Sequence, residues 1–327
     1  MTVLRWGILG TARISRKVIP AIVDSKRQCV HAIASRSLEK AQAEALKYSI
    51  PRVYANYENL LADPDIDIVY VPLPNALHAQ WTLAAIKAGK HVLCEKPMTL
   101  SLQEADEVAE AAHAAGVVVC EAFMYRHHSA ILRVRKLILE NAIGRVRLMR
   151  GTFRFTLNRP ADVRFDPALG GGSLWDVGCY PVSYARFLME KEPLEAFGWA
   201  QMTPSGVDET FAGQLRFPDG VLLQFDCGFT SPYKVEMEIV GSTGTIRVAQ
   251  PFRPGQVCNV ELTRDDQAVE SIGIDGGPDY CGAIENMADA VLGKGPSRIT
   301  LEDSRGNCAV LLALLRSARE GSSIHVD

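Results

Sequence analysis

Up to about residue 122, short apolar runs alternate with stretches of helical periodicity, and this alternation constrains the fold more than any other feature. The apolar runs are VLRWGILG, CVHAIAS, DIVYVPLP, HVLCEK and GVVVCEAF, with helical stretches beginning near Ile14, Leu38 and Ala76 and again after HVLCEK. Such repetition is typical of a doubly wound parallel sheet. Ser101 and Glu104 have capping-box spacing, and Gly89 and Gly116 stand where helices should end. We therefore predict an N-terminal α/β domain over residues 1–122.

The second half of the chain changes to a strand period after a helix expected around residues 128–140. In RVRLMRGTFRFTL, apolar Met149, Phe153 and Phe155 alternate with polar residues, which predicts a long strand with one face in solvent. Further strands are expected at EAFGWAQM, TFAGQLRF, VLLQFDCGF, KVEMEIVG and TIRVA, and helices at 280–292 and 301–319. We predict a mostly antiparallel open-sheet α+β domain over residues 123–327.

Composition excludes several classes of partner. The 327 residues carry a formal net charge of −3, without the basic stripe that a phosphate backbone requires, so we expect no nucleic-acid partner. No apolar run approaches the roughly 18 residues of a membrane span, and MTVLRWGILGTARIS lacks the pattern of a signal peptide. The eight cysteines are scattered without CxxC pairs. We expect a soluble, unprocessed, reduced and metal-free cytoplasmic protein.

The segment WGILGTARIS predicts a dinucleotide-binding turn, because a strand ends at Gly10 and a helix follows. Measured against GxGxxG, Gly10 takes the first position, while Ala12 and Ser15 replace the later glycines with other small side chains. An ordinary strand-to-helix turn stays open as the alternative on this segment alone. The residues assigned here to the cofactor are Gly10, Thr11, Ala12, Arg13 and Ile14.

The end of the second strand, AIASRSLEKA, indicates which cofactor binds. Ser35 and Arg36 stand where an NAD-binding chain usually offers an acid to the ribose hydroxyls, about twenty residues after the turn. A cation there favours the extra phosphate of NADP. Lys40 lies one helical turn further and is a second candidate cation, although both charges are also explained as solvated side chains at a helix start.

The segment VPLPNALHAQW follows another strand. Its Pro72, Leu73, Pro74 and Asn75 are assigned to the nicotinamide ribose, because a stiff backbone and an amide suit that position. His78 is a candidate for positioning this site, with capping or packing of the helix as the alternative. No cysteine or carboxylate stands at metal-ligand spacing from it, so we expect no zinc site.

The degraded glycine turn, PNALH, CEKP, EAFMYR and LGGGSLWDVGCYP, in this order, resemble the glucose–fructose oxidoreductase, inositol dehydrogenase and MocA (Gfo/Idh/MocA) family. The resemblance runs essentially end to end. RFDPALGGGSLWDVGCYP is most similar to the branch of D-xylose and trans-dihydrodiol dehydrogenases. The resemblance implies an N-terminal NADP-binding Rossmann domain and a second domain for substrate binding and oligomerisation.

The resemblance implies that Lys96 of EKP lies beside the nicotinamide and hydrogen-bonds the reacting oxygen, often with the bond before Pro97 in the cis form. Glu95 is assigned to the cofactor site with it. A lysine at the carboxyl end of a parallel strand lies in the crevice where such sheets bind ligands, and partial burial lowers a lysine pKa. A loop ion pair between Glu95 and Lys96 that caps the sheet is the alternative.

Asp176 and Tyr180 have i, i+4 spacing on a predicted helix and therefore share a face. Many family members have histidine at the second position, whereas Tyr180 resembles the dihydrodiol and glucose–fructose branch, in which the phenol is the proposed acid/base. Lys96 nearby would favour the phenolate, and Asp176 would orient substrate hydroxyls. The alternatives are a packing tyrosine and a first-turn helix charge. Further substrate contacts are assigned to Tyr125, Arg126, Arg164, Phe165 and Trp175.

The sequence thus predicts an NADP-dependent oxidoreductase, with NAD as the less favoured cofactor. It would transfer hydride between nicotinamide and a secondary or anomeric hydroxyl, or the matching carbonyl, of a sugar, polyol or trans-dihydrodiol. We expect a homodimer or homotetramer. Two alternatives stay open: a non-catalytic NAD(P)-sensing regulator on the same fold, and a glycosidase that retains NAD. Retained Lys96 and Tyr180 argue against the regulator, and Arg36 disfavours the glycosidase.

Overall fold

The computed structural model describes residues 3–159, 161–265 and 267–326. The chain forms two compact units. Unit 1 contains Met1–Met124 and Tyr280–Arg305, and unit 2 contains Tyr125–Asp279 and Gly306–Asp327. The first segment of unit 1 ends at Met124, two residues after the domain boundary that was predicted at residue 122. The segment Tyr280–Arg305, which the sequence analysis places in the second domain, belongs to unit 1.

Unit 1 is built on a six-stranded sheet in the order β3-β2-β1-β4-β5-β6, with every pair parallel. This strand order is that of the Rossmann fold and confirms the predicted fold class. The strands are β1 (Leu4–Leu9), β2 (Gln28–Ala34), β3 (Arg52–Tyr54), β4 (Ile68–Val71), β5 (His91–Cys94) and β6 (Val119–Glu121). The helices are α1 (Ser15–Val23), α2 (Leu38–Tyr48), α3 (Tyr57–Leu61), α4 (His78–Lys87), α5 (Leu102–Ala115) and α8 (Cys281–Val291).

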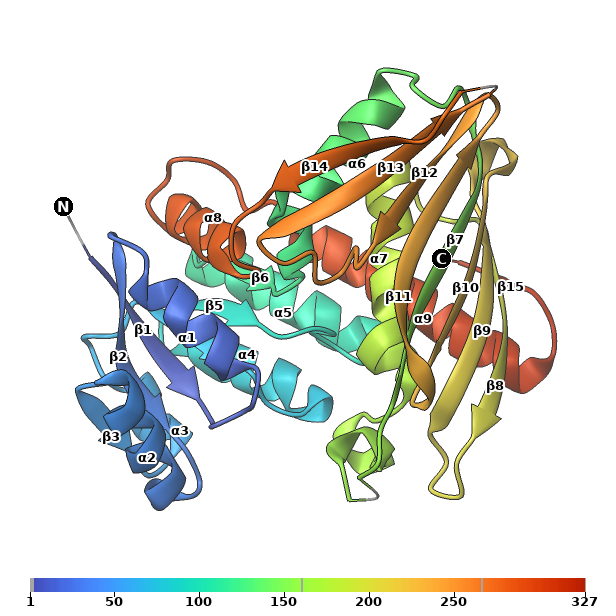
Figure 1. Cartoon of the computed structure of the whole chain (residues 1–327). Helices are drawn as coiled ribbons and strands as arrows, with labels where there is room; N and C mark the ends of the chain where they lie inside the picture. The colour runs from blue at the N-terminus through green and yellow to red at the C-terminus, as the bar shows by residue number, and fades with distance from the viewer. Residues whose placement is uncertain (1–2, 160, 266, 327) are drawn as a thin grey trace. The chain divides into compact units, whose positions relative to one another are not determined.

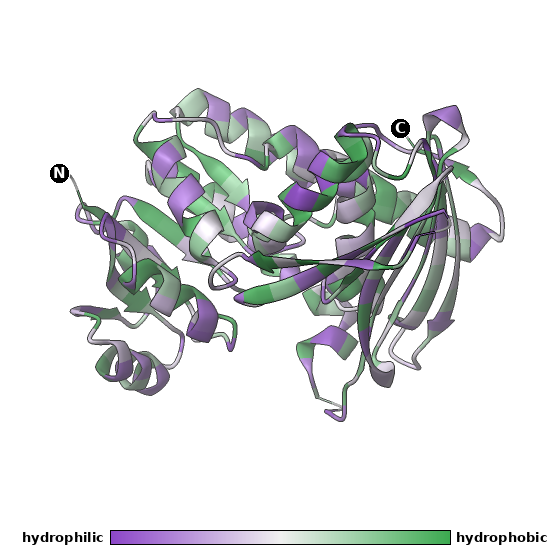
Figure 2. Ribbon diagram, turned by 45° about the horizontal axis from the view of Figure 1, so that its top comes forward, coloured by the Kyte–Doolittle hydropathy of each residue, from purple (hydrophilic) through white to green (hydrophobic). Residues whose placement is uncertain are grey.

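Local sequence signals explain where these elements begin and end. The Ser101 hydroxyl accepts a hydrogen bond from the backbone N–H of Glu104 at 3.2 Å, and α5 ends at Gly116 with a left-handed φ of 65°. One face of the sheet packs on α3, α4 and α5 through apolar residues such as Leu9, Val69 and Leu60. In Figure 2 the strands of this sheet are largely hydrophobic, as expected for parallel strands buried on both faces.

Helix α8 returns to unit 1 from the far end of the sequence and packs beside α1 (Figure 1). Arg27 forms ion pairs with Glu285 and with Asp289, the latter at 2.7 Å. The Gln28 amide donates to the carbonyl oxygen of Ile284 at 3.2 Å. Helical periodicity shows that α8 has an apolar face but not which sheet that face covers. The sequence therefore gives no basis for placing α8 in the first unit.

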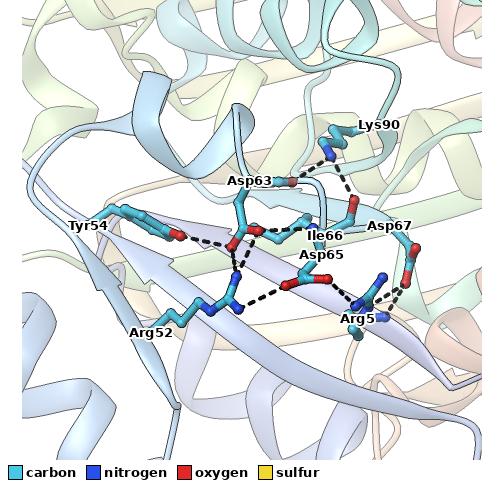
Figure 3. Close-up of polar contacts among 8 residues, drawn as sticks. All are labelled: Arg5, Arg52, Tyr54, Asp63, Asp65, Ile66, Asp67 and Lys90. Atoms are coloured by element: carbon cyan, nitrogen blue, oxygen red, sulfur yellow. Dashed lines mark hydrogen bonds and ion pairs between the residues drawn. The ribbon is translucent and has the colours of Figure 1, made fainter.

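A network of charges lies where β1, β4 and β5 begin, at the amino-terminal edge of the sheet (Figure 3). Asp63 is buried and accepts hydrogen bonds from the Arg52 guanidinium at 2.9 Å, the Tyr54 hydroxyl at 2.8 Å and the Asp65 backbone at 2.9 Å. Burial would raise the pKa of Asp63, but these donors outweigh it and hold the pKa at about 2. The network comprises Arg5, Arg52, Tyr54, Asp63, Asp65, Asp67 and Lys90.

Unit 2 is built on a nine-stranded sheet in the order β14-β13-β12-β11-β7-β10-β9-β8-β15. Every pair is antiparallel except β10 with β7, which confirms the mostly antiparallel prediction. The strands are β7 (Val146–Thr156), β8 (Glu195–Met202), β9 (Asp208–Arg216), β10 (Leu222–Gly228), β11 (Thr230–Gly241), β12 (Gly244–Ala249), β13 (Val257–Arg264), β14 (Glu270–Asp275) and β15 (Ile324–His325). The helices are α6 (Ser129–Leu139), α7 (Cys179–Met189) and α9 (Leu301–Glu320), whose first turn belongs to unit 1.

The two faces of this sheet differ, as the alternating residues in Figure 2 show. Met149 and Phe153 of β7 are buried on the face that packs against α7. The opposite face carries ion pairs between neighbouring strands, including Arg150 with Glu238 at 2.7 Å. Trp199 of β8 is 65% exposed.

A search of the described residues for membrane-spanning helices finds none that is long and apolar enough.

Candidate active site

The turn after β1 has the backbone that a dinucleotide requires. Gly10 has a φ of 91°, a conformation that favours glycine, and a side chain there would approach Leu73 to 3.2 Å. Helix α1 begins at Ser15, without an acidic residue in its first turn. The Ser15 hydroxyl is buried and has no hydrogen-bond partner in the described part of the chain. These features fit a pyrophosphate at the helix N-terminus. Of the other residues predicted in this turn, Arg13 is exposed, whereas three are partly buried: Thr11, Ala12 and Ile14.

The cationic end of β2 is open to a ligand. Arg36 and Lys40 are both exposed, whereas Ser35 is buried and its hydroxyl accepts the backbone N–H of Ser37 at 3.2 Å. Tyr57 is buried near this charge: burial raises the pKa of its phenol, and the Arg36 charge opposes the shift. The sequence analysis did not identify Tyr57 as a neighbour of Arg36.

His78 joins the two loops that contain other predicted cofactor residues. Its ring nitrogens lie 2.7 Å from the carbonyl oxygen of Pro97 and 2.6 Å from that of Leu73. Burial lowers the pKa of His78 to about 4, with the two carbonyls opposing and the Lys96 charge adding to the shift. His78 thus positions the loop after β5 against the loop after β4. In the β4 loop Pro72 is buried, while Leu73, Pro74 and Asn75 are partly exposed.

The EKP segment follows β5, and its Lys96–Pro97 peptide bond is cis. Lys96 is partly buried, and its backbone N–H lies 3.4 Å from the Glu95 carboxylate. Glu95 itself is 7% exposed, and its Oε1 accepts hydrogen bonds from the hydroxyls of Tyr70 at 2.7 Å and Tyr280 at 3.0 Å. The Glu95 carboxylate therefore contacts the interior of unit 1 as well as Lys96.

In unit 2, Asp176 lies in a π-helical turn, Leu174–Gly178, that leads into α7. Such turns are frequent at functional sites. Arg164 donates from Nε to Asp176 at 2.6 Å and from Nη1 to Asp162 at 3.0 Å. The Asp176 charge, opposed by burial, raises the pKa of Arg164 further. The structure thus brings together Asp176 and Arg164, two residues that the sequence assigns to substrate.

Asp208 of β9 anchors this π-helical turn. Its carboxylate is buried and accepts the Leu174 backbone N–H at 2.7 Å and the Ser173 hydroxyl at 2.6 Å. Burial raises the pKa of Asp208, and these two donors oppose the shift. Gly172 has a φ of 118°, and a side chain there would meet Asp208 at 2.4 Å. Sequence reasoning missed Asp208, because a single aspartate at the start of a strand carries no local signal.

Tyr180 lies in an aromatic cluster of unit 2. Its ring centre is 5.3 Å from both Phe153 and Phe252 and 5.9 Å from Tyr125. Tyr125 is fully buried, and its hydroxyl donates to the Ser183 hydroxyl at 2.9 Å. The packing alternative for Tyr180 is therefore compatible with its ring contacts and with its 3% exposure.

The other predicted substrate residues lie in different surroundings within unit 2. Trp175 is 7% exposed, and Arg126 is buried over the Phe187 ring at 4.2 Å. Phe165 lines a wide-open cavity of about 650 Å³ together with Leu157, Asn158, Arg159, Thr203, Pro204 and Ser205. Lys96 belongs to unit 1, whereas Asp176 and Tyr180 belong to unit 2.

One group of side chains in the described part of the chain has the spacing of a metal site: His31, Asp63 and Asp65. Arginines already pair with both carboxylates, Arg52 with Asp63 at 2.9 Å and Arg5 with Asp65 at 2.7 Å. These ion pairs account for the acidic cluster without a metal. All eight cysteines lie in the described residues, and none of them forms a disulfide.

Comparison with known families agrees with this architecture. The Gfo/Idh/MocA oxidoreductase family with an NAD-binding Rossmann fold matches residues 4–123, and the Gfo/Idh/MocA C-terminal domain matches residues 131–247. The chain belongs to the Gfo/Idh/MocA family of oxidoreductases. The predicted family, fold and enzyme class are thereby confirmed.

Two relatives and one solved structure illustrate the similarity. A D-xylose 1-dehydrogenase (NADP(+)) of Haloferax volcanii is 36% identical over 99% of this chain and 100% of its own length. A trans-1,2-dihydrobenzene-1,2-diol dehydrogenase of Danio rerio is 36% identical over 75% of this chain and 74% of its own. The crystal structure of KijD10, a 3-ketoreductase from Actinomadura kijaniata with NADP and TDP-benzene, has a TM-score of 0.92 at 30% identity, covering 97% and 98% of the two chains.

Proposed function

We propose that this oxidoreductase uses NADP to oxidise a secondary or anomeric hydroxyl of a sugar, polyol or trans-dihydrodiol, or to reduce the matching carbonyl. Unit 1 binds the cofactor, and unit 2 binds the substrate and forms the oligomer. The substrate class is supported by the names of the relatives. A cytoplasmic location stays a prediction from the scattered cysteines.

The observation that carries the cofactor choice is Arg36. It is an exposed cation at the carboxyl end of β2, where an NAD-binding chain usually has an acid for the ribose hydroxyls. The glycine turn and the unpartnered Ser15 hydroxyl supply the pyrophosphate end of the same site. The residues of unit 1 thus fit NADP.

When bound, NADP supplies the nicotinamide carbon that accepts or donates the hydride. In the proposed oxidation, the phenolate form of Tyr180, favoured by the Lys96 charge, takes up the proton of the substrate hydroxyl and becomes a neutral phenol. Lys96 hydrogen-bonds the reacting oxygen and stabilises the charge that develops on it. Asp176, held by Arg164 at 2.6 Å, orients the neighbouring substrate hydroxyls.

A substrate panel tests the proposal. The full-length protein is incubated with NADP and either D-xylose, other aldoses or a trans-dihydrodiol, and NADPH formation is followed by its near-ultraviolet absorbance. We expect steady NADPH formation with at least one member. NADP binding without turnover on any member, in either direction, would instead support the regulator. NAD that copurifies with the protein, with glycoside cleavage but no net redox change, would support the glycosidase.

A further inference from the structure

Glu95 is a buried carboxylate that no step of the proposed reaction uses. It follows β5 directly, and its side chain points into unit 1 rather than into solvent, with 7% of its surface exposed. Two phenols from distant parts of the sequence meet it: Tyr70 in β4, fully buried, and Tyr280, immediately before α8 and 3% exposed. Both hydroxyls donate to the same oxygen, Oε1, at 2.7 Å and 3.0 Å.

The hydrogen bonds are compatible with an ionised carboxyl group. An ionised carboxylate only accepts hydrogen bonds, and two phenols donate to one of its oxygens. Burial raises the pKa of Glu95 above its usual value, and the Lys96 charge, the two phenols and the Lys96 backbone N–H reduce this shift. These donors and the adjacent ammonium favour the ionised form.

Three further titratable groups lie around Glu95 and Lys96, and one of them, Glu121, is a second buried carboxylate. Cys94 is buried in β5, and burial raises its pKa, so the thiol is neutral. His78, the first residue of α4, lies near Lys96; burial lowers its pKa to about 4, and its two ring nitrogens contact the carbonyl oxygens of Pro97 and Leu73. Glu121 of β6 pairs with Cys94 in the sheet and accepts the Met98 backbone N–H at 2.9 Å.

We propose that Glu95, fixed by Tyr70 and Tyr280, is a positioning residue that keeps the Lys96 ammonium charged for the reaction. This inference rests on the proposed role of Lys96. A neighbouring anion favours the charged form of a lysine and raises its pKa. Tyr280 is the first residue of the segment that returns to unit 1, so this segment supplies one of the two phenols on Glu95.

Glu95→Gln separates this role from a merely structural one. The glutamine amide has the same size and still accepts hydrogen bonds from both phenols, so the anchor is retained while the charge is lost. The matched control is Asp63→Asn, which also removes a buried carboxylate that accepts a phenol, Tyr54 at 2.8 Å, but at the opposite edge of the same sheet.

The readout is the reactivity of Lys96 in the full-length protein without substrate. Acetic anhydride acylates only the unprotonated amine, so the extent of Lys96 acylation at each pH, measured by peptide mass spectrometry, gives a titration midpoint. We expect Glu95→Gln to lower that midpoint by about one pH unit or more, and Asp63→Asn to leave it unchanged. An unchanged midpoint in folded Glu95→Gln would overturn the inference.

A second variant covers the case in which Glu95→Gln does not fold. Replacing Tyr70 and Tyr280 together with phenylalanine leaves Glu95 in place but removes both donors that hold it as an anion. The Lys96 midpoint should then move down by a smaller amount, and no movement would contradict the proposal. The turnover of Lys96→Ala distinguishes a failure of the proposed function from a failure of this inference. Normal turnover would defeat the proposed function, whereas lost turnover with an unmoved midpoint in Glu95→Gln would defeat this inference alone.

Discussion

Arg36 is the proposed determinant of the preference for NADP over NAD, because it is an exposed cation at the carboxyl end of β2. In wild type we expect NADPH to bind at least about tenfold more tightly than NADH, a difference near 1.4 kcal/mol. Arg36→Asp should abolish this preference, because attraction to the extra phosphate becomes repulsion. Turnover at saturating cofactor should change little.

Dissociation constants of both cofactors, measured by fluorescence titration, check this prediction. Lys47→Asp is the control, since it makes the same charge change at an exposed position near the other end of α2. Unchanged NADPH affinity in Arg36→Asp would show that the cation is only a solvated charge at a helix start.

Single residues also mark the limit of what the sequence predicts. Arg36 is identified from its distance to the glycine turn, because that spacing is fixed by one strand and one helix. Glu95 is identified only as a neighbour of Lys96, since its partners Tyr70 and Tyr280 are 25 and 185 residues away. Nothing local in the sequence relates such distant residues, so the two hydrogen bonds to Glu95 could be identified only from the structure.

At the scale of elements, the parallel sheet of unit 1 was predictable because each of its longer strands is an apolar run followed by a helix. Strands β3, β13 and β14 were not predicted, since β3 has three residues and β14 mixes glycine with charged side chains. The helix predicted around Asp176 begins with a π-helical turn, which depends on the anchor at Asp208 rather than on helical propensity.

The charged edge of the sheet in unit 1 should contribute stability that depends on pH. Asp63 has a folded-state pKa of about 2, below its ordinary value of 3.8. A lowered carboxyl pKa stabilises the folded state above the unfolded pKa, and this contribution is lost as the pH falls from about 4 to about 2. Asp63→Asn should reduce the free energy of unfolding near neutral pH by up to about 2 kcal/mol, because Arg52 is partly exposed and solvent screens the pair.

Urea denaturation of wild type and Asp63→Asn across this acid range measures the effect. The difference between the two proteins should shrink as the pH falls, because wild-type Asp63 becomes protonated. A constant difference would mean that the aspartate stabilises unit 1 through its shape and hydrogen bonds rather than through its charge.

At the scale of the whole molecule, the nine-stranded sheet of unit 2 supports an oligomer. Trp199 is 65% exposed on the face that also carries the Arg150–Glu238 and Arg247–Glu236 ion pairs. A second copy of the chain that covers this face would bury the exposed tryptophan. We expect light scattering at micromolar concentration to show a homodimer or homotetramer. We expect Trp199→Glu to weaken the association of the copies. A wild-type monomer would contradict this expectation.

The proposed mechanism requires both Lys96 and Tyr180 to act on the reacting hydroxyl group of the substrate. The most direct measurement compares kcat, with the best substrate of the panel, for wild type, Lys96→Ala and Tyr180→Phe, alongside the NADPH dissociation constant of each protein. We predict that each substitution lowers kcat by about a hundredfold or more while NADPH binding stays nearly intact. A near-normal kcat for Tyr180→Phe across the pH range would show that this phenol only packs against Phe153 and Phe252, and would contradict the proposed mechanism.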